Sequence, residues 1–192
     1  MNPYNWRLDY GNSDWDLRHR LVANYLYDIP FFAGAHPAAR AIFANWQING
    51  ITILQSGRPF NVSIAEDRAN TSPGSTQRPD LIHSASSNCN GDHQRACIDA
   101  SAFALPALYT YGLAGRNILR GPHLYSTDLS LFKNIPIKER FRFQFRVEMF
   151  NVFNWPMFGN PASGFSTPAT FGNITSTSID NRVMQFGGKI VF

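Results

Sequence analysis

Histidine, serine and acidic residues that could act as catalytic groups or metal ligands are present in this chain, but their spacing matches no catalytic motif. The five histidines form no HExxH pair, and Ser56 and Ser75 lie in no nucleophile-elbow sequence. One polar segment combines two histidines with three aspartates: His83, His93, Asp80, Asp92 and Asp99. These side chains either make a weak contact with a metal or a siderophore, or are solvated loop residues. We adopt the second interpretation and predict no catalytic residue, no metal site, no cofactor and no enzyme activity.

Two cysteines and two arginines of the same region also allow a chemical and a structural interpretation. Cys89 and Cys97 have neither CxxC nor metal-ligand spacing. We expect them to form a local disulfide, which requires an oxidising compartment. Arg116 and Arg120 either attract an anionic ligand or belong to a structural turn.

The composition excludes several classes of protein. Charged residues make up 16% of the chain, below the ~25% of ordinary soluble proteins, and aromatic residues make up 14%. The net charge of +4 is dispersed, without a run of Lys and Arg, so we expect no nucleic-acid partner. No segment approaches the ~20 apolar residues of a transmembrane helix. The first residues do not resemble a secretory signal peptide, so we expect that the natural beginning of an exported protein is missing.

Apolar and polar side chains alternate in five segments, which predicts five β-strands. The expected strands are residues 20–29, 46–55, 125–137, 141–149 and the end of the chain from about residue 182. Segment 141–149 is the most regular, and its length matches the ~9–11 residues that cross a bilayer at a tilt. Its apolar residues are Phe141, Phe143, Phe145, Val147 and Met149. Its polar residues are Arg142, Gln144, Arg146 and Glu148. We expect Glu148 to form a salt-bridge network with Arg142 and Arg146 and to have no catalytic role.

The connections between these strands differ in length. Residues 31–45 form a connector in which alanines after Pro37 favour one or two helical turns, and residues 137–140 form a short turn. Residues 57–124 form a long polar loop without regular structure, and residues 154–181 form a loop rich in Gly, Pro, Ser and Thr. Antiparallel connectivity places the long loops on one side and the short turn on the other. This asymmetry is typical of outer-membrane barrels, whose long loops are external.

The last strand ends on an aromatic residue, in a pattern that resembles the signal by which bacterial outer-membrane β-barrels are recognised for assembly. The four specified positions of this signal are Gln185, Gly187, Ile190 and Phe192. The resemblance implies the barrel-assembly machinery as a partner. A buried strand of a soluble sandwich can also end on Phe, so the other strands decide between the two.

The whole chain, residues 1–192, is interpreted as all-β: a segment of an antiparallel up-and-down transmembrane β-barrel, with about five strands and long external loops. Five strands cannot close a barrel, because the smallest barrels have eight and open edges in lipid leave backbone groups unpaired. We therefore expect the C-terminal piece of a larger barrel in the bacterial outer membrane. The residues expected to face lipid are Phe141, Phe143, Phe145, Val147, Met149 and Phe186. The residues expected to face the lumen are Arg142, Gln144, Arg146, Glu148 and Lys189. A soluble secreted β-sandwich is an alternative.

Several motifs along the chain point to one family. They are RHR at 18–20, DIPF at 28–31, WQINGI at 46–51, QSGRPF at 55–60, AGRNILRGP at 114–122, DLSLFK at 128–133, RVEMFNVFN at 146–154, FGNITST at 171–177 and QFG at 185–187. Together they resemble the TonB-dependent receptors, in their Oar-like branch.

This resemblance implies a barrel of about 22 strands that encloses an N-terminal plug and takes up a scarce solute with energy supplied through TonB. Its implied partners are outer-membrane lipid, the remainder of the barrel, the plug, and TonB through an N-terminal segment; neither plug nor TonB-contacting segment is found among these residues. A structural or adhesive surface protein without active transport is the alternative function.

Overall fold

A computed structural model describes residues 2, 4–32, 34, 36–71, 76–89, 95–138 and 141–192. The chain divides into two compact units, which we describe separately. The strand unit consists of Arg20–Leu54, Tyr125–Pro156 and Ile179–Phe192. The loop unit consists of Met1–His19, Gln55–Leu124 and Met157–Ser178.

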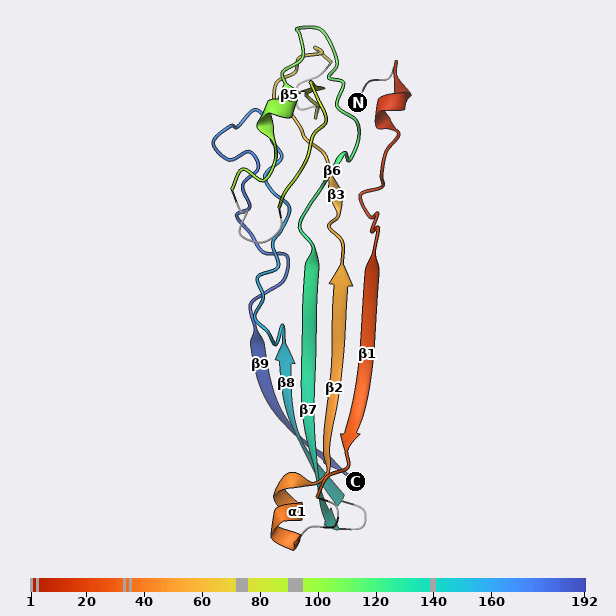
Figure 1. The fold of residues 1–192 in the computed structure, drawn as a ribbon, viewed down its shortest axis with the longest axis vertical. Helices are drawn as coiled ribbons and strands as arrows, with labels where there is room; N and C mark the ends of the chain where they lie inside the picture. Colours follow the sequence, from red (N-terminus) through yellow and green to blue (C-terminus); the bar gives the residue numbers. More distant parts are fainter. Residues whose placement is uncertain are drawn as a thin grey trace. The chain divides into compact units, whose positions relative to one another are not determined.

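The strand unit contains a five-stranded sheet in the order β1-β2-β7-β8-β9 (Figure 1). The strands are β1 (Arg20–Ile29), β2 (Trp46–Gln55), β7 (Leu124–Lys138), β8 (Phe141–Phe150) and β9 (Val183–Val191). Each long strand pairs with the long strand that follows it in the chain, so the sheet is an up-and-down meander. The five predicted strands are thus confirmed.

One predicted turn is wrong in its bounds. Residue 137 was expected at the junction of strand and turn and residue 138 within the turn, but both belong to β7, which continues to Lys138. A register shift between Pro136 and Lys138 lets the strand stay paired with β8 past the proline, which has no N–H to donate. Glu139 and Arg140 lie outside the described residues.

The strand register assigns side chains to the two faces of the sheet. Between β8 and β9, Phe145 lies opposite Gly188, Val147 opposite Phe186, and Met149 opposite Met184. Because residues that lie directly opposite share a face, these residues form one apolar face. The polar face is formed by the alternate pairs: Gln144 with Lys189, Arg146 with Gly187, and Glu148 with Gln185.

A glycine in β2 accommodates an aromatic ring of β1. A Cβ atom at Gly50 would lie 2.3 Å from Cζ of Tyr25. Only glycine therefore leaves room for the tyrosine ring to lie across the β2 backbone. The glycine of the WQINGI motif consequently has a packing role.

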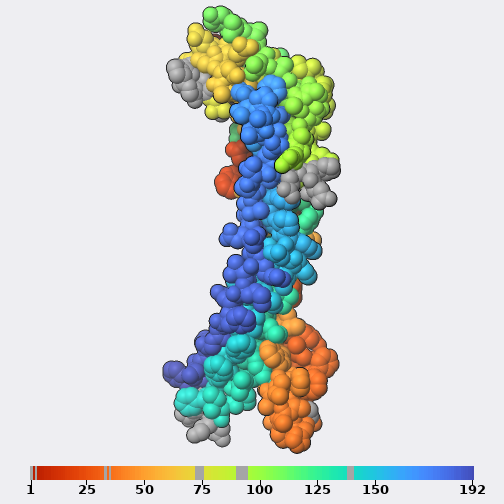
Figure 2. Space-filling view, turned by 90° about the vertical axis from the view of Figure 1, so that its left-hand side faces the viewer, coloured from red at the N-terminus to blue at the C-terminus, as the bar shows by residue number. Residues whose placement is uncertain are grey.

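The connector between β1 and β2 contains the helix α1 (Pro37–Phe43), which starts with the proline expected at a first helical position. In Figure 2 the connector, in orange, lies beside the ends of β7 and β8, in teal. Among the described residues, no helix is long and apolar enough to cross a membrane.

The loop unit is folded, so the prediction of a long loop without regular structure at 57–124 is wrong. Two short antiparallel pairs join β3 (Pro59–Phe60) to β6 (Leu119–Arg120) and β4 (Asp80–Leu81) to β5 (Phe103–Ala104). Two 3-10 helices, η1 (Trp6–Asp9) and η2 (Ala100–Ala102), also belong to this unit. Its buried core consists of Phe60, Val62, Cys89, Cys97, Ile98, Ala102, Phe103, Ala114, Leu119 and Phe171.

Candidate functional site

The apolar face of the sheet is open. Among the described residues of the strand unit, Ala44 is the one buried hydrophobic side chain. On β9, Phe186 is 68% exposed and Ile190 is 61% exposed. Burial of apolar surface is the main force that stabilises a water-soluble fold, and in this sheet the apolar side chains of β8 and β9 are at most partly buried. Its apolar face therefore requires another apolar environment.

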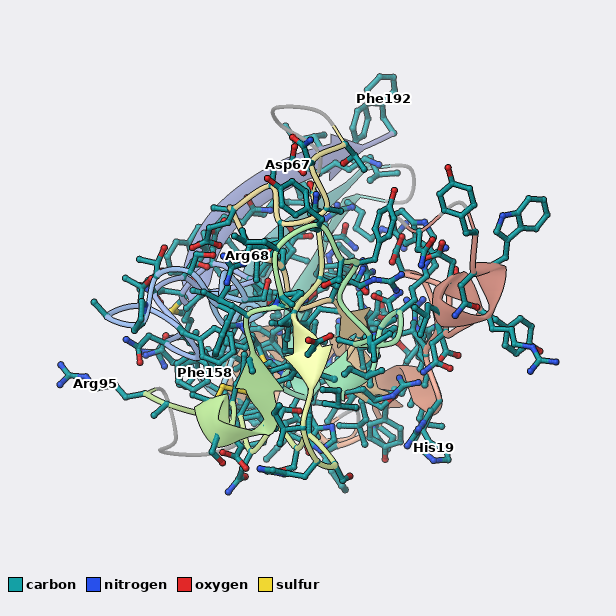
Figure 3. The ribbon with its side chains drawn as sticks, turned by 90° about the horizontal axis from the view of Figure 1, so that it is seen from above. His19, Asp67, Arg68, Arg95, Phe158 and Phe192 are labelled. Atoms are coloured by element: carbon teal, nitrogen blue, oxygen red, sulfur yellow. A yellow bond between two sulfur atoms is a disulfide. The ribbon has the colours of Figure 1, made fainter. Side chains whose placement is uncertain are left out.

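Aromatic side chains lie near both ends of the strands. Near one end, the Phe141 and Phe192 rings are 6.5 Å apart, and the Phe192 ring projects outward from the end of the chain (Figure 3). Beyond the other end of β8, the Phe153 and Trp155 rings stack 4.8 Å apart. Aromatic residues at both ends of an apolar band are the arrangement of a membrane-spanning β-structure.

The opposite face carries a hydrogen-bonded polar network. Gln144 Nε2 donates to Asn134 Oδ1 at 2.9 Å, and Arg146 Nε donates to Gln144 Oε1 at 2.7 Å. The Arg146 guanidinium lies 5.0 Å from the centre of the Phe132 ring. Glu148 accepts a hydrogen bond from Gln185. The expected salt bridges between Glu148 and the arginines of β8 are therefore absent from the described residues. Side-chain amides contact Glu148 and Arg146 instead.

In the loop unit, arginines attach the N-terminal segment to the rest of the unit. Arg116 forms a salt bridge with Asp14 at 3.2 Å, and Arg120 forms one with Asp16. A third salt bridge joins Arg78 to an aspartate of η1. Arg116 and Arg120 thus both pair with aspartates of the chain itself, which favours the structural interpretation over the binding of an anionic ligand.

Asn117 fixes the same segment and is 1% exposed. Its Nδ2 donates to the Asn12 carbonyl oxygen at 2.7 Å and to Asp14 Oδ1 at 2.6 Å, while its own N–H donates to Asn61 Oδ1 at 2.7 Å. Its backbone is left-handed, with φ of 53°, a conformation that asparagine adopts more readily than most residues. These contacts give the AGRNILRGP motif a structural role.

These contacts make the loop unit sensitive to acid. The hydrogen bond from Asn117, and then the Arg116 guanidinium, hold the pKa of the Asp14 carboxyl below its ordinary value. Because the pKa is lower in the folded state, the stabilisation by Asp14 is complete above about pH 4 and is lost as the pH falls through the folded-state pKa. We predict that hydrogen exchange over residues 8–17, corrected for intrinsic rates, increases between pH 5 and pH 3.

An Asp14→Asn variant is the control for this prediction. It should show increased exchange over residues 8–17 already at pH 7 and a smaller further increase in acid, while exchange in β8 stays unchanged. Equal acid sensitivity of the variant and the natural protein would contradict the role of Asp14.

Two of the histidine and serine side chains considered as catalytic groups or metal ligands make contacts within the loop unit. His83 lies 3.3 Å from the Ser84 carbonyl oxygen and 3.2 Å from Ser101 Oγ. Ser56 Oγ accepts from the His19 N–H at 3.1 Å. Within the described ranges, no group of three or more His, Cys, Asp and Glu side chains could hold a metal. Three residues considered above lie outside these ranges: Ser75, Asp92 and His93.

Cys89 and Cys97 form a disulfide in the core of the loop unit. Both are nearly inaccessible, with exposures of 2% and 5%. The bond closes the segment that precedes Ile98 and places both sulfur atoms among the buried apolar side chains.

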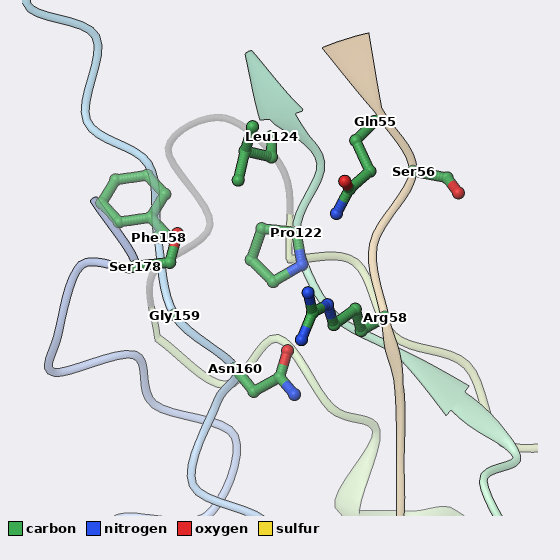
Figure 4. Close-up of a pocket in the computed structure, with 9 residues that line it drawn as sticks. All are labelled: Gln55, Ser56, Arg58, Pro122, Leu124, Phe158, Gly159, Asn160 and Ser178. Carbon is green, nitrogen blue, oxygen red and sulfur yellow. The ribbon is translucent and has the colours of Figure 1, made fainter. Parts of the chain in front are cut away.

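The loop unit also contains a cavity of about 350 Å³ with a mixed polar and apolar lining (Figure 4). It is lined by Gln55, Ser56, Arg58, Pro122, Leu124, Phe158, Gly159, Asn160 and Ser178. The Arg58 guanidinium points toward Asn160 and lies 5.1 Å from the centre of the Trp15 ring. No described carboxylate forms a salt bridge with Arg58. The cavity thus offers a cation, amides and hydroxyls to a polar ligand with negative charge.

Three important residues were not singled out from the sequence. Lys133 follows Phe132 in β7 and reverses the expected alternation, since Lys133 lies opposite Phe145 on the apolar face. Asn151 is 4% exposed and exchanges hydrogen bonds with the N–H and carbonyl of Trp155. The sequence contained one indication for Lys133, because the order of apolar and polar residues in β7 reverses at residues 132–133. Nothing in a single sequence distinguishes Asn151 or Asn117 from a surface asparagine.

Comparison with known proteins identifies a family. A family model described as "Outer membrane beta barrel domain" matches residues 1–185. No curated protein and no solved structure matches the chain.

Proposed function

Because the chain belongs to the outer membrane beta barrel domain family, we propose that its strands form part of the wall of a TonB-dependent transporter that takes up a scarce solute. The family places the protein in the bacterial outer membrane and in contact with its lipid, so a soluble secreted sandwich is excluded. The observation that carries the proposal is the sheet with an open apolar face and a hydrogen-bonded polar face. A wall between lipid and a water-filled lumen needs both.

In this proposal, the apolar face meets lipid and the polar face lines the lumen. The lipid-facing residues are Phe141, Phe143, Phe145, Val147, Met149 and Phe186. The lumen-facing residues are Arg142, Gln144, Arg146, Glu148 and Lys189. Three of these five side chains are cationic and one is anionic, so this part of the lumen attracts anionic groups.

The loop unit is proposed to be external and to contact the solute before uptake. All three of its segments connect to the same ends of the antiparallel strands, the ends opposite the tight connection between β7 and β8. In outer-membrane barrels the longer loops are external. A disulfide fits that location, because disulfides persist outside the reducing cytosol. The Arg58 cavity gives the unit a feature that could bind a small polar molecule.

The remaining partners follow from the family resemblance. The plug, the remainder of the barrel and a TonB-contacting segment would complete the transporter. The terminal signal at Gln185, Gly187, Ile190 and Phe192 would address the chain to the barrel-assembly machinery. No enzyme activity is proposed.

A structural or adhesive surface protein is the second candidate, and the folded, disulfide-closed loop unit favours it equally. Comparison of a deletion strain with its complemented strain distinguishes the two functions. Both strains would be grown in a complex medium, and the residual solutes would be measured by mass spectrometry. A transporter depletes a particular solute in the complemented strain alone, and a protonophore that collapses the proton gradient abolishes this depletion.

Equal solute depletion by both strains, together with a loss of surface attachment in the deletion strain, would overturn transport and support adhesion. A depletion that persists in the presence of the protonophore would overturn the dependence on TonB.

A further inference from the structure

A buried lysine lies on the apolar face of the sheet. Lys133 lies opposite Phe145, between Leu131 and Ile135 on the same face of β7. It is 6% exposed. An ammonium group among lipid chains would be unfavourable, so the structure around Lys133 must shield it.

The connector between β1 and β2 provides this shield. Lys133 Nζ donates a hydrogen bond to the Ala44 carbonyl oxygen, immediately after α1. The same ammonium lies 5.4 Å from the centre of the Trp46 ring. The carbonyl groups at the end of a helix carry partial negative charge. The end of α1 is therefore held over the apolar face by a cation of β7.

Two further hydrogen bonds fix the connector in place. Trp46 Nε1 donates to the Ile42 carbonyl oxygen at 2.9 Å. The Asn134 N–H donates to the Asn45 carbonyl oxygen at 3.0 Å. Both bonds belong to the strand unit, so α1 is a fixed part of the sheet surface and covers the apolar face near Trp46, at the beginning of β2.

The outer surface of the connector is itself apolar. We define the connector patch as Phe31, Phe32, Ile42 and Phe43, whose exposures are 61%, 51%, 60% and 52%. The Phe32 and Phe43 rings are 5.3 Å apart, so the patch is continuous across the two ends of the connector. Basic side chains accompany it, since Arg40 and His36 are exposed on the same segment.

We propose that the connector patch inserts into the headgroup region of a phospholipid leaflet and anchors this end of the sheet in the membrane. The inference rests on the proposed assignment of the apolar face to lipid. Three observations favour lipid as the occupant. The patch continues the apolar face, the neighbouring Trp46 has the amphipathic character of interfacial residues, and the exposed Arg40 guanidinium suits lipid phosphates.

The helix α1 has seven residues and one charged side chain, and its exposed apolar side chains can lie in the membrane interface as those of a longer interfacial helix do. Ile42 and Phe43 flank the half-buried Ala39 on one side of α1, while Ala41 lies on the other side, as the 100° rotation per residue requires. Lys133 holds the helix while its charge is satisfied by backbone and an aromatic ring. The sheet can thus carry a lysine on its apolar face at the level of the membrane surface.

Position-specific fluorescence quenching tests this inference. Because both cysteines form a disulfide, an Ile42→Cys variant would carry one free thiol for a bimane label. The full protein, extracted from outer membranes, would be reconstituted into phosphatidylcholine vesicles. Lipids brominated near the headgroup should quench the Ile42 label more strongly than lipids brominated near the chain end, because an interfacial side chain lies at the headgroup boundary.

Two matched labels complete the test. An Ala41→Cys label, on the other side of α1, should show little quenching by either lipid. A Val147→Cys label should be quenched most by lipids brominated near the chain end, because the middle of β8 is expected at the bilayer midplane. This label tests the proposed lipid face independently of the connector.

The outcomes separate the two proposals. Quenching at position 147 without quenching at position 42 would overturn the interfacial anchor and leave the barrel wall intact. In that case, protection of the Ile42 thiol from maleimide would indicate that protein covers the patch. Absence of quenching at both positions would overturn the proposed lipid face and the anchor with it.

Discussion

Substitution of Val147 by arginine is expected to prevent stable insertion of the sheet into a bilayer. Val147 lies in the middle of β8, opposite Phe186 on β9 and Leu131 on β7, so its side chain belongs to the apolar face. An arginine on the lipid face at the bilayer midplane destabilises a membrane β-barrel by about 2–4 kcal/mol. The expected result is loss of folded protein from the outer-membrane fraction and a lower free energy of unfolding from phospholipid vesicles, measured by urea titration.

Ser130→Arg is the matched control. Ser130 precedes Leu131 in β7 and therefore lies at nearly the same depth as Val147, but on the polar face and opposite Glu148. Its arginine would meet a carboxylate and the proposed lumen, so we expect a change of less than about 1 kcal/mol. Equal losses from the two variants would show that the faces do not differ in environment, which contradicts the proposed wall.

The strands could be predicted because their information is local. In β8 each side chain alternates with its neighbour for nine residues, and the bounds of β1 and β2 agree with the predicted segments. A period of two identifies a strand without knowledge of its partners. The apolar positions of a strand also predict which residues share a face, as the pairing of Phe145 with Gly188 and of Val147 with Phe186 illustrates.

The loop unit could not be predicted because its information is not local. Phe60, Cys89, Leu119 and Phe171 belong to one core but are separated by long polar segments. Its strands contain two residues each, too few to show a period. A cluster assembled from such distant residues has no signature in a window of the sequence, so the segment was taken for a loop without regular structure.

Lys133 shows a second limit of prediction from pattern. The Phe132–Lys133 pair reverses the apolar and polar order of β7. In the sequence alone, this reversal looks like an interruption of the strand pattern. The reversal is satisfied by elements outside the strand: Arg146 covers the Phe132 ring on the polar face, and the carbonyl of Ala44 accepts from Lys133 on the apolar face. The reversal at Phe132 and Lys133 is explained by the register of β7 with β8 and by the position of the connector between β1 and β2.

Removal of the disulfide is expected to loosen the loop unit without disturbing the strands. Closing a segment of this size reduces the entropy of the unfolded chain by an amount worth about 2.5 kcal/mol. Cys89 and Cys97 are also buried beside Phe103 and Leu119 in the same core. We therefore expect reduction by dithiothreitol to increase hydrogen exchange at these core positions by one to two orders of magnitude, about the factor to which this free energy corresponds.

The Cys89→Ala/Cys97→Ala variant distinguishes the effect of the disulfide bond from the effect of burying its two sulfur atoms. Reduction removes the covalent link and keeps both sulfur atoms in the core, whereas the variant removes the link and two buried sulfur atoms, each of which adds a packing loss. The variant should therefore exchange faster than the reduced protein, and exchange in β8 should be the same in both. If reduction left exchange at Phe103 and Leu119 unchanged, the core would be held by side-chain packing alone. The disulfide would then have no stabilising role in the loop unit.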